Sequence, residues 1–181
     1  MINFQVHTRE TAPEASKALM DKAHEAYGLI PSMHRVMAES PQLLEAYINL
    51  FNLFSQCSLS KEQRHVVWLT VSVHHDCHYC VPAHCQIASM DGIDKKIIDA
   101  IRKDEAIDDK NLEALRQYTN SVVFNRGKVA VEESKTMINL GFSKQNLLDI
   151  NLGIAHKVLS NYTNFLVNSP IDEPFLPFKE I

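Results

Sequence analysis

Residues 60–92, SKEQRHVVWLTVSVHHDCHYCVPAHCQIASMDG, contain the pattern that decides the fold. Ser60 is followed three residues later by Gln63, the capping-box spacing that is typical of a helix start. The segment that follows is rich in apolar residues, from Val66 to Val73. It predicts a helix that begins after Ser60 and is deeply buried.

A second helix is expected directly after the first. The polar residues His74-His75-Asp76 interrupt the apolar pattern, and Asp is favoured at the N-cap position of helices. Asp76 therefore predicts a helix from Cys77 to about Met90, which Gly92 is placed to end.

Helix signals dominate the rest of the chain as well, and strand-like alternation is scarce. Thr11 and Glu14 form another capping-box pattern, and Ser143 is a candidate cap for a long last helix. The pattern predicts an all-α protein with about eight or nine helices in a single domain, residues 1–181. Further helices are expected at about 11–27, 31–37, 41–55, 93–101, 112–125, 131–140 and 143–168, followed by an extended tail at 170–178.

A weak internal repeat links two parts of the chain. Ser60-Lys61 recurs as Ser143-Lys144, and at the same offset His78-Tyr79-Cys80 aligns with Asn161-Tyr162-Thr163. The repeat raises a possible internal duplication, which would give two related helical hairpins with thiols in only one of them.

Composition excludes several classes of protein. The chain has 181 residues, of which 45% are hydrophobic and 22% charged, as in ordinary globular domains. A net charge of −4 offers no basic surface for nucleic acid. No apolar run approaches the ~20 residues that span a bilayer, and the first residues do not resemble a signal peptide. We therefore expect no nucleic-acid or membrane partner and a cytoplasmic protein, whose thiols are mostly reduced.

The candidate site is a Cys-x-x-Cys-x-x-x-His pattern formed by Cys77, Cys80 and His84. At 100° per residue, these three side chains share a face about 60° wide on the predicted helix. A helix N-terminus stabilises a thiolate, and closely spaced cysteines can form a disulfide. His84 follows Cys80 by four residues, so it can accept the Cys80 proton. The pattern favours dithiol–disulfide chemistry.

Other interpretations stay open. The same three residues could bind zinc, with His74 or Cys85 as a fourth ligand, although their position within two turns of one helix makes tetrahedral geometry awkward. They could also form a redox sensor without turnover, or a buried inert pair. Cys85 lies off the reactive face. Asn161, Tyr162 and Asn164 on the last helix could line the pocket, but helix packing is the favoured interpretation.

The segment Cys77-His78-Tyr79-Cys80-Val81-Pro82-Ala83-His84 resembles the signature of the carboxymuconolactone decarboxylase/alkylhydroperoxidase D superfamily, in its peroxidase-related branch of about 180 residues. The segments 59–64 and 28–41 resemble the family too, so the likeness covers most of residues 10–170. It implies an all-α alkylhydroperoxidase D-like fold and a homo-oligomer with an antioxidant role. The true decarboxylases lack the cysteine pair, which argues against lactone decarboxylation.

The resemblance also implies a role for each site residue. Cys80 is the thiol that attacks a hydroperoxide or disulfide substrate, Cys77 is the resolving thiol, and His84 belongs to the proton relay. An external dithiol reductant restores the thiols, and no metal or other cofactor is implied. The family peroxidases place a glutamate where this chain has His65. Candidates for that part of the relay are His65 itself, Asp76, His74 and Glu62.

Overall fold

The structure is a computed structural model that describes residues 3–179. Within these residues it contains nine α-helices, one 3-10 helix and no strand, which confirms the all-α prediction. The helices are α1 (Glu14–Tyr27), α2 (Ser32–Met37), α3 (Pro41–Ser55), α4 (Lys61–His74), α5 (Cys80–Met90), α6 (Lys95–Arg102), α7 (Lys110–Phe124), α8 (Val131–Asn139), α9 (Lys144–Val167) and η1 (Glu173–Phe178).

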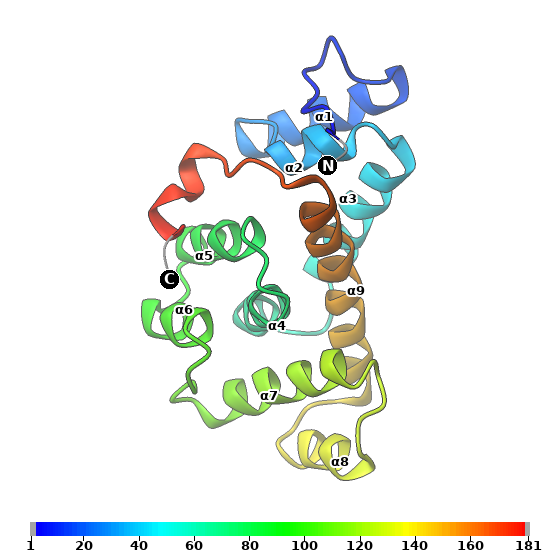
Figure 1. The fold of residues 1–181 in the computed structure, drawn as a ribbon. Coiled ribbons are helices and arrows are strands. Elements are labelled where there is room, and N and C mark those ends of the chain that lie inside the picture. The colour runs from blue at the N-terminus through cyan, green and yellow to red at the C-terminus, as the bar shows by residue number, and fades with distance from the viewer. Residues whose placement is uncertain (1–2, 180–181) are drawn as a thin grey trace.

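Helix α4 is the centre of the fold (Figure 1) and packs against α5, α6, α7 and α9. Its capping box is formed as predicted, because Gln63 N donates to Ser60 Oγ and Ser60 N donates to Gln63 Oε1. All residues from His65 to Ser72 are buried. The largely apolar sequence of this helix is explained by packing partners on every side.

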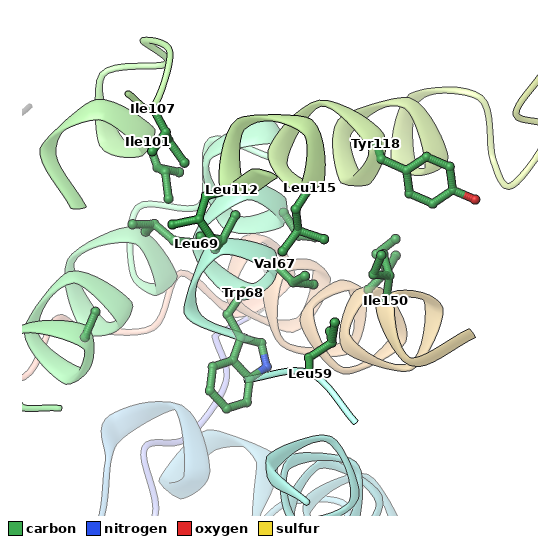
Figure 2. Packing of buried hydrophobic residues seen from close by; sticks show 14 of the residues in the cluster. Leu59, Val67, Trp68, Leu69, Ile101, Ile107, Leu112, Leu115, Tyr118 and Ile150 are labelled. Atoms are coloured by element: carbon green, nitrogen blue, oxygen red, sulfur yellow. The ribbon is translucent and has the colours of Figure 1, made fainter. Parts of the chain in front are cut away.

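The buried apolar residues form two clusters. The larger one surrounds α4 and α7, and Figure 2 shows Leu69, Leu112 and Leu115 packed above Trp68. The smaller one joins α1, α2 and α3 to the start of α5, and it contains Cys77 and Cys80. The two thiols therefore lie where the N-terminal helices meet the central layer.

Helix α9 runs past both clusters and contacts α3 and α4. Gly153 permits the close approach, because a Cβ atom there would lie 2.5 Å from Phe54 Cζ. Residues 144–167 form one continuous helix, in contrast to the α4–α5 hairpin. The weak sequence repeat is therefore not accompanied by a second hairpin.

Three local predictions were wrong. Helix α5 begins at Cys80 rather than Cys77, because Asp76 takes a left-handed conformation (φ 50°) and residues 75–79 form a turn. Asp tolerates this conformation, which ends α4 instead of capping the next helix. The N-cap of α1 is Pro13 without a side-chain bond, while Thr11 Oγ1 accepts a bond from Thr8 N. Part of the tail is not extended but forms the 3-10 helix η1.

Within residues 3–179, no helix is both long enough and apolar enough to cross a bilayer.

Candidate active site

Cys77 and Cys80 are adjacent although only one of them is helical. Cys80 is the first residue of α5, and Cys77 lies in the turn before it. The backbone N–H of Cys80 donates to Cys77 Sγ over 3.3 Å. Both cysteines are free thiols with exposed fractions of 0% and 2%. The structure thus brings the predicted pair together at the start of α5, where the helix dipole favours a thiolate.

Helix α9 presents a buried polar face to Cys80. Asn164 Nδ2 lies 3.2 Å from Cys80 Sγ, and Ser160 Oγ lies 3.7 Å from it. The members of this face are spaced i, i+3, i+4 and i+7, so they share one side of the helix. They are all buried: Lys157, Ser160, Asn161 and Asn164.

His84 is one turn beyond Cys80 on α5, as predicted, but its polar contact is different. Its Nε2 atom lies 2.7 Å from Lys157 Nζ. Since an ammonium has only donors, Nε2 is the acceptor, which leaves the hydrogen on Nδ1. Within residues 3–179, Nδ1 is buried without a hydrogen-bond partner. The polar contacts of Cys80 Sγ come from α9 and not from His84.

The two thiols differ in acidity. Burial opposes ionisation of Cys80, but polar neighbours outweigh it and hold the pKa of Cys80 well below its usual range; these neighbours are Cys77, Lys157, Ser160 and Asn161. The pKa of Cys77 is raised, first by its hydrogen bond to Cys80 and then by burial. The surroundings of the pair therefore favour ionisation of Cys80 over ionisation of Cys77.

The two buried histidines next to Lys157, His84 and His156, are neutral. Burial lowers the pKa of His84 well below its usual value, and the nearby Lys157 charge lowers it further. Burial and Lys157 do the same to the pKa of His156, whose Nδ1 accepts a bond from Trp68 Nε1 over 2.9 Å.

The relay candidates are scattered. His65 is buried on α4, its ring centroid lies 5.5 Å from that of Trp68, and its Nε2 lies 2.7 Å from Asp91 Oδ2. The Trp68 ring in turn lies 5.4 Å from the ring of His84. The other three candidates do not lie with the cysteines at the pocket: Glu62 is half-buried in the first turn of α4, and His74 and Asp76 are exposed at its far end.

A pocket of about 370 Å³ gives access to the site. Cys80, His84 and Lys157 line it, together with Asp91, the partner of His65. Most of its wall is apolar and aromatic, with rings from Tyr27, Tyr47, Phe51, Tyr79 and Phe175. The pocket therefore suits a small organic molecule with an apolar body.

The C-terminal segment covers part of this pocket. In Figure 1 it runs from the end of α9 to lie beside α5, and Pro174 and Phe175 reach the pocket wall. Asp172 holds the segment in place, since its carboxylate accepts bonds from Ser32 N, Ser32 Oγ and the Tyr79 hydroxyl.

The geometry does not favour the zinc alternative. Among residues 3–179, no group of three or more His, Cys, Asp or Glu side chains is arranged to hold a metal ion. Lys157 occupies the Nε2 side of His84, His74 is exposed, and Cys85 belongs to the larger core cluster rather than to the site.

Sequence reasoning missed Lys157 and Ser160, and it assigned Asn161 and Asn164 to packing. A signal was present, because four polar residues with helical spacing interrupt a segment that otherwise has the pattern of a buried helix. Such a polar stripe on a buried helix needs partners inside the protein. Asp91 was also missed, since it lies in a turn after α5 and meets His65 only through the fold.

Comparisons with known proteins agree with this architecture. The model of the carboxymuconolactone decarboxylase family matches residues 41–120, which include both cysteines, His65 and His84. A comparison with curated proteins found no match.

Solved structures extend the likeness to the whole chain. A peroxidase-related protein from Ralstonia eutropha JMP134, described as an alkylhydroperoxidase AhpD core, has a TM-score of 0.87 at 17% identity, over 99% of this chain and 96% of that one. A peroxidase-related protein from Silicibacter sp. TM1040 gives 0.81 at 14% identity, over 96% and 92%. The debrominase Bmp8 in complex with 2,3,4-tribromopyrrole gives 0.80 at 18% identity, over 99% of each chain.

These likenesses show a shared fold, and the family match lies on the segment that carries the thiols. The chain is therefore similar to the carboxymuconolactone decarboxylase family over residues 41–120, and it shares its fold with peroxidase-related proteins of the alkylhydroperoxidase D type.

Proposed function

We propose that this protein is a thiol-dependent oxidoreductase with an antioxidant role, in which Cys80 reduces a hydroperoxide or a disulfide. The observation that carries the proposal is the environment of Cys80. Its Sγ lies beside Cys77, contacts Ser160 Oγ, accepts a bond from Asn164 Nδ2, and lines a pocket open to small molecules. A stabilised thiolate in an accessible pocket is the condition for nucleophilic sulfur chemistry.

The peroxide reaction proceeds in two steps. The Cys80 thiolate attacks the terminal peroxide oxygen, the O–O bond breaks, and Cys80 becomes a sulfenic acid while an alkoxide leaves. The alkoxide takes up a proton through His84 and becomes an alcohol. The Cys77 thiol then attacks the Cys80 sulfenic sulfur, which forms the disulfide and releases water.

An external dithiol completes the cycle. It reduces the Cys77–Cys80 disulfide by thiol–disulfide exchange and is itself oxidised to a disulfide. The same exchange run with a disulfide substrate gives the alternative activity. The His65–Asp91 pair, at the position of the family glutamate, is proposed to support the relay because Asp91 also lines the pocket.

The size and lining of the pocket favour an organic substrate over hydrogen peroxide. Aromatic rings offer apolar contacts that a molecule as small and polar as hydrogen peroxide does not use. The debrominase Bmp8, which has a similar fold, was solved in complex with 2,3,4-tribromopyrrole, another small organic molecule, so the fold accommodates more than one reaction.

The test follows peroxide consumption by the prereduced protein, with cumene hydroperoxide as substrate and dithiothreitol as reductant. Cys80→Ser is expected to abolish turnover, and Cys77→Ser, prereduced and then freed of dithiothreitol, to consume one equivalent of peroxide and keep a dimedone-reactive sulfenic acid on Cys80. Cys57→Ser is the matched control, because Cys57 is a half-buried thiol outside the pocket. Turnover that survives Cys80→Ser contradicts the mechanism. A reversible Cys77–Cys80 disulfide without turnover identifies a redox sensor instead.

We also propose a homo-oligomer in a reducing, cytoplasmic setting. Several large apolar side chains are exposed on the single chain, among them Leu148, Phe165 and Leu166 on α9. Contact between copies would remove such surface from water. Light scattering that gives the monomer mass of 20.6 kDa contradicts the assembly.

A further inference from the structure

The most unusual group in the site is a buried lysine. Lys157 is 1% exposed, and its Nζ lies 2.7 Å from His84 Nε2. No carboxylate among residues 3–179 pairs with it, since the salt bridges of these residues all lie elsewhere. A buried ammonium with only a neutral partner is costly, so its position requires a nearby negative charge.

The charge can come from only one of the groups that face Lys157. These groups are Cys77 in the turn before α5, Cys80 and His84 on α5 and His156 on α9, while Tyr47 on α3 lines the same pocket as Lys157. His84 and His156 have lowered pKa values and carry no charge. The pKa values of Tyr47 and Cys77 are raised, so both keep their protons. Cys80 is the remaining candidate.

We infer that Lys157 is the charge-balancing residue of the active site: its buried ammonium stabilises the Cys80 thiolate and fixes His84 as a neutral imidazole with its hydrogen on Nδ1. The inference rests on the proposed role of Cys80 as the attacking sulfur. Lys157 lies on α9, outside the matched segment 41–120, so the thiol motif and its counter-charge come from different parts of the chain.

Helix α9 supports this role through its geometry. Lys157, Ser160 and Asn164 lie on one face, so the cation and two neutral polar groups converge on the start of α5. Hydrogen bonds from neutral groups and one opposite charge are the two interactions that lower a thiol pKa against the effect of burial.

The test measures the pH dependence of Cys80 alkylation by iodoacetamide, with the modified residue identified by tandem mass spectrometry. Lys157→Met keeps an unbranched apolar side chain, shorter by the terminal nitrogen atom, and removes the charge. We expect the midpoint of the alkylation profile to rise by at least about one pH unit, and alkylation near neutral pH to slow about tenfold. Leu159→Ala, a half-buried neighbour on α9, is the matched packing control and is expected to leave the midpoint unchanged.

Two results overturn the inference: a folded Lys157→Met protein with the wild-type midpoint, or a Leu159→Ala protein with the same shift. If Lys157→Met does not fold, the wild-type protein labelled with ¹³C at the lysine ε position decides. One lysine resonance should then titrate together with the ultraviolet absorbance of the Cys80 thiolate, and Cys80→Ser should abolish that titration. If no lysine resonance follows Cys80, Lys157 is not its counter-charge. Neither measurement uses a peroxide, so both test the role of Lys157 even if the protein has no peroxidase turnover.

Discussion

Gly153 is the position where the fold and the site are most sensitive to one added methyl group. A Cβ atom there would lie 2.5 and 2.6 Å from two ring atoms of Phe54 and 2.9 Å from Val67 Cγ1. Phe54 is 0% exposed, and its ring lies edge-on to Trp68 at 5.1 Å. Trp68 in turn lies against His84, so a displaced Phe54 ring would disturb the wall of the active site.

The magnitude follows from two opposing effects. The Phe54 contact is shorter by about 0.9 Å than the 3.4 Å at which ordinary contact begins. Overpacking of a buried site costs about 1–3 kcal/mol, and two stiff neighbours place this site near the upper end. Alanine gains about 1 kcal/mol over glycine in helix propensity. We expect Gly153→Ala to lower the free energy of unfolding by about 2 kcal/mol, or Tm by about 4–8 °C.

Urea denaturation of a double-mutant cycle tests the cause. Phe54→Leu removes the two ring atoms in question, so the cost of Gly153→Ala should fall by at least about 1 kcal/mol in that background. The substitution Asn151→Ala, at an exposed position of the same helix, measures a gain in helix propensity without any effect of overpacking. Equal costs in the two backgrounds, or a Gly153→Ala protein as stable as the wild type, would refute the reasoning.

Two further predictions concern the pocket and its surroundings. The substitution Asp172→Asn weakens the hydrogen bonds that hold η1 over the pocket. Amide hydrogen exchange in η1 should therefore accelerate at least about tenfold. The substitution Glu173→Gln, at the exposed neighbouring position, should leave the exchange rate unchanged. Burial lowers the pKa of His34 from 6.5 to about 4 in the folded protein. Because the unfolded state binds the proton more readily than the folded state, the free energy of unfolding should fall as the pH falls from 6.5 towards 4. Urea midpoints measured across this range should depend less on pH in His34→Gln, and an unchanged slope contradicts the prediction.

The sequence predicted the elements whose signals are local. Ser60 and Ser143 cap their helices as expected, because a cap depends on residues within one turn. Gly28 ends α1 in a left-handed conformation (φ 71°), again a local property. The start of α5 was wrong by three residues, since Asp76 is compatible both with an N-cap and with the left-handed end of α4. Only packing selects between these two conformations.

The candidate site likewise has features that depend on local sequence and features that depend on the fold. Cys80 and His84 could be placed on one helix face because they are four residues apart on α5. The chemical difference between Cys77 and Cys80 could not be obtained from that spacing. It depends on Lys157 and Ser160, which follow Cys80 by 77 and 80 positions in the sequence and reach it only because α9 packs beside α5.

A Cys-x-x-Cys segment fixes the distance between two sulfurs, whereas the surrounding fold decides which of them ionises. In this chain the turn at 75–79 keeps Cys77 out of the helix, so Cys80 is the first residue of α5 and Cys77 Sγ accepts its backbone N–H. Ser160 and Asn164 on the polar face of α9 then contact Cys80 Sγ. Exchanging the roles of the two cysteines would require a different position of α9, and Gly153 fixes that position through its contact with Phe54. In the proposed mechanism, the choice of the attacking thiol therefore follows from helix packing, which the motif by itself does not encode.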